Sequence, residues 1–240
     1  MVQIEGSGDV DQSTRLLLSV AEQLKMPLTS IARHAELTTV GAGQAIDSAL
    51  IHAQATAALT LVDSYLLGIE LLAAQATLQL EPVSVSSILT DTAHQLDRYA
   101  RQYGVHLEVA LAGRYEPVMA HHAGLKAALT SLGYALIEAR AASEDKGPKR
   151  VILAGHRTPH GIATGMYGVN GIDGVGLRKA LALYGTAKQP LTSLLGSSGA
   201  GVFVADALAH AMTSRLRAGR HGRKAGLAMT LLPSQQLQFI

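Results

Sequence analysis

The first 80 residues carry an apolar spacing that only long helices satisfy. Two segments, from residue 12 to about 40 and from residue 44 to about 78, have apolar side chains every three or four positions. The first stripe is Leu17, Val20, Leu24, Leu28, Ile31, Ala35 and Thr38, and the second is Ile46, Leu50, Ala53, Ala57, Leu61, Tyr65 and Ile69. "GAG" at residues 41–43 separates them. Each helix would be roughly 45 Å long.

A single pair of such helices cannot bury both apolar stripes. Two helices joined by a short turn fold back as an antiparallel hairpin, and each stripe then stays half covered. A second copy of the hairpin would cover the remainder. The pattern therefore predicts a homodimer with a four-helix bundle formed by residues 12–80, after a frayed segment at residues 1–11.

The periodicity changes at "LEPVSVSSIL", residues 80–89. We expect Pro82 to end the second helix, Val83 and Val85 to form a short strand, and Ser86 or Ser87 to cap the next helix. Strands and helices then alternate, and the last two strands, "SRLRAGR" and "GLAMTLLP", form a hairpin. An all-helical start followed by mixed elements predicts an α+β chain of two domains, with the second at residues 81–240.

Composition narrows the classes of protein that this chain can represent. Hydrophobic residues make up 48% and charged residues 16%, so the chain is expected to fold. A net charge of +2 is too small to indicate nucleic-acid binding, and the basic segment "SRLRAGRHGRK" is expected to be a solvated hairpin edge. The absence of cysteine excludes disulfides and thiolate metal sites. We expect a cytoplasmic chain, with no signal peptide and no apolar run that reaches the roughly 18 residues of a membrane span.

Five separated segments match one known family in the same order. They are "EQLKMPLTSIARHAEL", "LEPVSVSSILTDTAHQL", "LKAALTSLGYALIEA", "GSSGAGVFVADAL" and "GLAMTLLP". Together they resemble the transmitter region of sensor histidine kinases, from about Ser13 to Pro233. The resemblance implies a dimerisation hairpin followed by a Bergerat-type α/β sandwich that binds ATP. Pro27 occupies the position of a proline that bends the family's first helix beside its phosphorylation site.

The positions that would carry phosphate chemistry in the helical hairpin differ from the family pattern. Glu22 aligns with the phospho-accepting histidine, and a glutamate cannot form a phosphoramidate. Gln23 aligns with the adjacent activating acid and cannot act as a base at neutral pH. Met26 aligns with the Thr or Asn that orients water for phosphatase chemistry. The resemblance therefore implies a degenerate phosphorylation site.

The nucleotide-binding positions differ in the same way. Ala135 aligns with the family's metal-binding asparagine, Ser131 with an earlier asparagine, and Tyr167 with the adenine-binding aspartate. We expect the Tyr167 ring or the neighbouring loop to fill the adenine slot, and no ATP or magnesium to bind. The glycine-rich loops would keep only a weak ability to hold an anion at a helix N-terminus, through the remnant positions Gly171, Gly196, Gly199 and Gly201.

Two functions remain open from the sequence. The first is a degenerate dimeric module that binds a response-regulator receiver domain, or another protein, without transferring phosphate. The second is an active kinase or phosphotransferase that uses ATP or a relocated histidine, either His34 or His52. His121 and His122 are adjacent, so on a helix they point about 100° apart and are expected to be surface residues rather than joint metal ligands.

Overall fold

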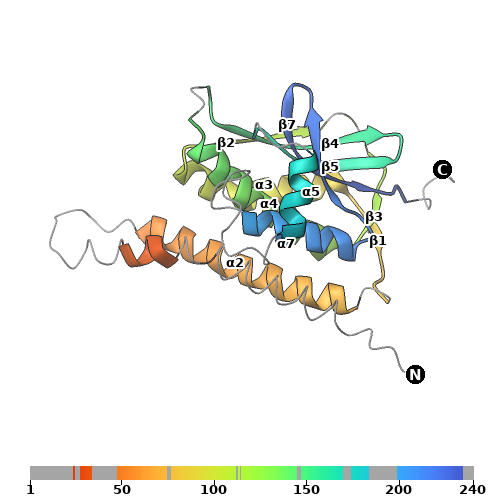
Figure 1. Cartoon of the computed structure of the whole chain (residues 1–240), viewed down its shortest axis with the longest axis horizontal. Helices are drawn as coiled ribbons and strands as arrows, with labels where there is room; N and C mark the ends of the chain where they lie inside the picture. The colour runs from red at the N-terminus through yellow and green to blue at the C-terminus, as the bar shows by residue number, and fades with distance from the viewer. Residues whose placement is uncertain are drawn as a thin grey trace.

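The protein folds into three layers in the computed structural model (Figure 1). The structure describes residue 24 and residues 28–33, 48–74, 77–111, 113, 115–144, 147–169, 174–183 and 199–234. Its helices are α2 (Ser48–Ala73), α3 (Val85–Gln102), α4 (His122–Ala142), α5 (Gly174–Leu183) and α7 (Gly199–Ala211). Its strands are β1 (Glu81–Val83), β2 (His106–Leu111), β3 (Val118–Ala120), β4 (Arg150–Thr158), β5 (Gly161–Tyr167), β6 (Leu216–His221) and β7 (Lys224–Leu231). Helix α2 contacts α3, α4 and α7, and these three helices contact the strands.

The main sheet has the order β2-β4-β5-β7-β6. Strands β2 and β4 are parallel, and α4 lies in the connection between them, as a parallel pair requires. The other neighbours are antiparallel, including the β6–β7 hairpin that the sequence predicted. A separate two-stranded sheet pairs β1 with β3. The α+β prediction is therefore confirmed.

Helix α4 lies at the centre of the molecule, between the sheet and the outer helices. Most of its side chains from Leu125 to Glu138 are buried, because the helix is covered on more than one side. At Gly133 there is no room for a side chain, since Leu96 of α3 and Met166 of β5 fill the space where a Cβ would lie. The apolar face of β5 is thereby packed closely against α4.

The N-terminal helices agree in part with the sequence prediction. Residues 28–33 are helical, and the predicted stripe of α2 is buried at Ala53, Ala57 and Leu61. This stripe is covered by the chain's own helices, since Ala57 and Leu61 belong to the main core. Gly68 of α2 lies close to Leu208 of α7. Burial of the stripe therefore does not depend wholly on a second copy.

The boundary between α2 and α3 differs from the prediction. Helix α2 ends at Ala73, well before Pro82, so the proline does not terminate it. Ser84 rather than Ser86 or Ser87 is the N-cap of α3, because its backbone is extended and its hydroxyl accepts a hydrogen bond from the Ser87 amide at 3.4 Å. Val85 is consequently the first helical residue and is not part of a strand.

One described helix is long and apolar enough to cross a membrane. The segment Ile51–Ala73 of α2 has 23 residues and a mean hydropathy of 1.4, so the expectation that no segment qualifies is wrong by this measure. A third of its most apolar window is buried inside the structure (33%), and a core helix passes the same test. In the described part of the chain this helix packs on α7, α4 and α3.

Candidate functional site

Several predicted site residues lie outside the described part of the chain. They are Glu22, Gln23, Met26, Pro27, His34, Gly171 and Gly196. Their proposed roles therefore stay predictions.

The two asparagine-equivalent positions of α4 are closed to solvent. The side chains of Ser131 and Ala135 are both completely buried. The Ser131 hydroxyl is buried and has no hydrogen-bond partner in the described structure, and the Ala135 methyl belongs to the main core. This part of α4 consequently exposes no oxygen atom that could hold a magnesium ion.

A buried hydrogen bond joins α3 to the same region of α4. The Tyr99 hydroxyl donates to Glu138 Oε1 at 2.6 Å, and Glu138 is only 9% exposed. The Tyr99 ring also packs edge-on against Tyr134, with 4.7 Å between the ring centroids. Burial and the charge of Glu138 raise the pKa of Tyr99 far above its usual range, so the hydroxyl stays protonated and acts as a donor. The bond fastens α3 to α4 one turn beyond Ala135.

Tyr167 does not lie beside α4, so its ring does not fill a slot there, whereas residues 170–173 of the neighbouring loop, the other part of this expectation, lie outside the described residues. Met166 packs against Gly133 of α4, and consecutive residues of a strand point to opposite faces of the sheet. Tyr167 instead joins a separate cluster with Ala154 and Ala228. The period of β5 therefore directs this side chain to the face away from α4.

Tyr167 and two histidines form a group of rings on that face. The Tyr167 ring lies 5.5 Å from the ring of His221 and 6.2 Å from that of His156, and the two histidine rings are 5.9 Å apart. The Tyr167 hydroxyl is buried without a hydrogen-bond partner among the described residues, and burial raises its pKa to about 12. Burial, and then the neighbouring His221, lower the pKa of His156. The sequence offered no local signal for this group, because its members come from three separate strands.

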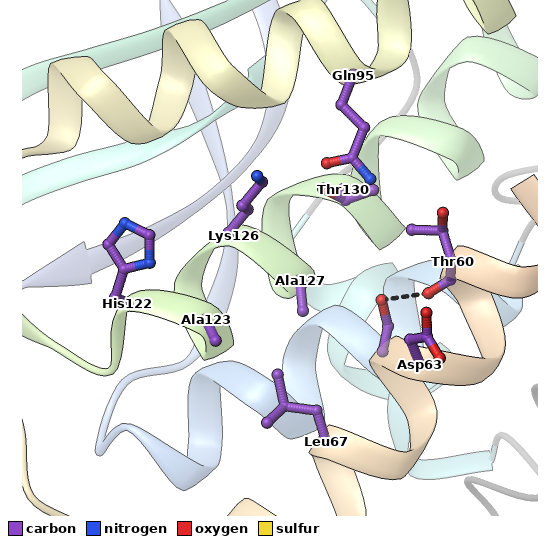
Figure 2. A pocket seen from close by; sticks show the side chains of 10 residues that line it. Thr60, Asp63, Leu67, Gln95, His122, Ala123, Lys126, Ala127 and Thr130 are labelled. Carbon is purple, nitrogen blue, oxygen red and sulfur yellow. Dashed lines mark hydrogen bonds between the residues drawn. The ribbon is translucent and has the colours of Figure 1, made fainter. Parts of the chain in front are cut away.

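A groove lined mainly by polar and charged residues runs between α2, α3 and α4 (Figure 2). Its volume is about 410 Å³, within the usual range for ligand pockets. Lys126 is half-buried on α4, and Asp63 is exposed on the facing helix α2. The Thr130 hydroxyl is buried there without a hydrogen-bond partner in the described structure. The lining residues are Thr60, Asp63, Ser64, Leu67, Gln95, His122, Ala123, Lys126, Ala127 and Thr130.

This groove has the chemistry of a binding surface. Its hydroxyls lie on helices, and the Ser64 hydroxyl donates to the Thr60 carbonyl oxygen at 2.8 Å, which withdraws it from nucleophilic use. His122 lines the groove and is exposed, and its neighbour His121 is the N-cap of α4, with Nδ1 accepting from the Gly124 amide at 3.1 Å. His121 is therefore a capping residue and not the plain surface residue that we expected.

The remaining predicted positions are placed as follows. His52 is exposed on α2, with Thr56 Oγ1 3.5 Å from its Nδ1. Gly199 is the first residue of α7, and Gly201 is buried in that helix. Within the described ranges, no three His, Cys, Asp or Glu side chains converge in a way that could hold a metal ion.

Comparison with known proteins identifies the fold. No protein-family model matches the chain, and no curated protein matches it. Full-length ShkA in complex with AMPPNP is similar with a TM-score of 0.54 and 19% identity, over 78% of this chain and 38% of that one. Histidine kinase AdeS of Acinetobacter baumannii is similar with a TM-score of 0.48 and 13% identity, over 88% of this chain and 98% of the AdeS chain. A bacterial phosphotransferase is similar with a TM-score of 0.48 and 11% identity, over 95% of this chain and 98% of the phosphotransferase chain.

The likeness to ShkA is a likeness of fold. The chain has the fold of a histidine kinase transmitter region, as the sequence resemblance predicted. It spans little more than a third of the ShkA chain. What the fold does in this chain depends on its own residues.

Proposed function

We propose that this chain is a degenerate, homodimeric histidine-kinase-like module of a cytoplasmic two-component system. In this role it binds a response-regulator receiver domain and transfers no phosphate. The observation that carries the proposal is the complete burial of Ser131 and Ala135 on α4, at the positions where the family resemblance implies two asparagines, the second of them the metal-binding one.

The missing groups account for a large loss of nucleotide affinity. Replacing the adenine-binding carboxylate removes a charge-assisted hydrogen bond, which costs about 1.5–3 kcal/mol. Tyr167 cannot replace that contact, because its side chain is on the other sheet face from α4. Loss of the metal contact at Ala135 adds a comparable amount. A total of roughly 3–5 kcal/mol lowers affinity by two to four decades, which takes a micromolar site to millimolar.

Calorimetry with ATP or ADP and magnesium tests the first half of the proposal. We expect no binding below about 1 mM, and no acid-labile phosphate after incubation with labelled ATP. A micromolar dissociation constant, or label on His34 or His52, would overturn the proposal and favour an enzyme.

The partner is tested separately. Purified receiver domains from the same organism are titrated onto the immobilised chain without nucleotide. We expect at least one receiver domain to bind at micromolar concentration. Addition of ATP should leave this affinity unchanged. Failure of every receiver domain would remove the two-component role and leave only a nucleotide-independent binding protein.

The homodimer is supported by an exposed apolar ridge on α2. Leu59 and Leu66 are seven residues apart, so they lie on one helix face, and they are 66% and 52% exposed. Leu28 is also 54% exposed on the preceding helical segment. Leu24 is different, because it packs against the core of its own chain and would report on folding as well as association.

Sedimentation of the variant Leu59→Glu/Leu66→Glu tests the dimer. We expect the wild type to sediment as a dimer at micromolar concentration and the double variant as a monomer with unchanged helix content. Val175→Glu is the control, because Val175 is 69% exposed on α5 rather than on α2. A monomeric wild type would refute the dimer.

A second candidate, a phosphotransferase, is favoured by the exposed His52 on α2. Its imidazole is accessible and lies beside the Thr56 hydroxyl. Incubation with a phosphorylated receiver domain would then place acid-labile phosphate on the chain, and His52→Ala would abolish it. Transfer that survives His52→Ala would exclude His52 as the acceptor.

A further inference from the structure

We propose that His156, Tyr167 and His221 form a binding site for one late first-row divalent metal ion, Zn²⁺ or Cu²⁺. The site lies on the sheet face away from α4, apart from the helical groove and the nucleotide-equivalent positions. It does not depend on the proposed function, since none of its three residues takes part in that proposal as a ligand.

The fold brings the three side chains together from distant strands. His156 is on β4, Tyr167 on β5 and His221 on β6, and two strands separate β4 from β6 in the sheet. At about 4.8 Å per strand, a flat sheet would keep β4 and β6 roughly 14 Å apart. The histidine rings are nevertheless 5.9 Å apart. The two histidine side chains therefore meet across the intervening strands β5 and β7.

Two buried polar atoms of the group lack partners in the described structure. They are the Tyr167 hydroxyl oxygen and the His156 Nδ1 atom. Tyr167 has no exposed surface at all, so its hydroxyl cannot be satisfied by bulk water. A buried polar atom without a partner is unfavourable. A metal ion that accepts both lone pairs would satisfy the two atoms at once.

The ring separations agree with a shared metal ion. Metal–nitrogen and metal–oxygen bonds of about 2.0–2.2 Å, in a tetrahedral arrangement, put two histidine ring centroids roughly 5 Å apart and a tyrosine and a histidine roughly 6 Å apart. The observed values are 5.9 Å for the histidine pair and 5.5 and 6.2 Å for the tyrosine pairs. All three are within about 1 Å of these ring separations.

The imidazole and phenol donors of this group are ligand types that late first-row metal ions accept. On binding, the metal–oxygen bond replaces the Tyr167 O–H bond, and the proton passes to solvent. Imidazole ligands select Zn²⁺ and Cu²⁺ over Mg²⁺.

Metal titration of the full chain tests the site. Calorimetry with Zn²⁺ should show one equivalent bound per chain at micromolar affinity, and Mg²⁺ should not bind. Added Cu²⁺ should give a visible phenolate-to-copper charge-transfer band. His221→Ala and His156→Gln should each weaken Zn²⁺ binding at least tenfold, and Tyr167→Phe should remove the band.

His106→Ala is the matched control, because His106 is an exposed histidine on β2 of the same sheet. It should leave both signals unchanged. His221 is half-buried at a strand end, so His221→Ala is expected to fold and decides the matter if Tyr167→Phe does not fold. Absence of saturable metal uptake, or uptake that survives His221→Ala but falls with His106→Ala, would overturn the site.

Discussion

Removal of the Tyr99 hydroxyl tests whether α3 is fastened to α4 by the bond to Glu138. Tyr99→Phe keeps the ring and its packing against Tyr134 but deletes the donor of the 2.6 Å hydrogen bond. The acceptor is a carboxylate that is 9% exposed, so water cannot fully replace the lost donor. A hydrogen bond to a charged group contributes about 1.5–3 kcal/mol, and we expect the free energy of unfolding to fall by this amount.

The assay is thermal and urea unfolding at pH 7. In a chain of this size each kcal/mol shifts the melting temperature by about 2–4 °C, so Tyr99→Phe should melt about 3–12 °C lower. Tyr103→Phe is the matched control: Tyr103 is half-buried, and its hydroxyl oxygen lies 3.3 Å from that of Tyr99, whose single proton is donated to Glu138. We expect a loss below about 1 kcal/mol there.

The pH dependence provides an independent check. The pKa of Tyr99 is raised in the folded state, so its stabilising effect is complete below the unfolded value of about 10 and is lost as the pH rises above it. Tyr99→Phe should flatten this alkaline decline. Equal stability of Tyr99→Phe and the wild type, or a larger loss in Tyr103→Phe, would refute the reasoning.

Three further predictions follow from burial and titration. Because the pKa of His156 is lowered in the folded state, the free energy of unfolding of the metal-free chain should fall as the pH drops below about 6.5. The difference between the urea midpoints at pH 7.5 and 5.0 should be smaller in His156→Gln than in the wild type. Ala135→Asn should lower the free energy of unfolding by about 1–3 kcal/mol, because it places an amide at a fully buried site, and it should not restore ATP binding. The control Ala142→Asn, at an exposed site, should be nearly neutral. ATP binding by Ala135→Asn would contradict the prediction. Leu61→Ala should cost about 2–5 kcal/mol in urea unfolding because Leu61 is in the core, whereas exposed Leu59→Ala should cost little.

Local pattern was enough to predict several elements. Apolar spacing of three and four located α2, and the last two strands were predicted as a hairpin. These signals are local, because a helix or strand that buries one face must repeat its apolar residues with the period of that element. The separated segments that resemble histidine kinases also predicted the fold correctly.

The sequence was less informative at element ends. Helix α2 stops at Ala73, and Ser84 is the cap of α3, although Pro82, Ser86 and Ser87 are equally plausible signals in the sequence. A cap is chosen by the backbone conformation of one residue and by which amide its hydroxyl reaches. Both are properties of the folded backbone, which runs into α3 directly from β1, a strand paired with the distant β3.

Only the tertiary structure decided which surfaces face each other. Sequence periodicity identified an apolar stripe on α2 but not its cover, which is formed in part by the chain's own α4 and α7. Alignment put Tyr167 at a nucleotide position, yet the strand directs it to the other face, beside His156 and His221. Spacing along a chain fixes which side chains share a face of one element. The neighbours of that face depend on the order of strands that are tens of residues apart in the sequence.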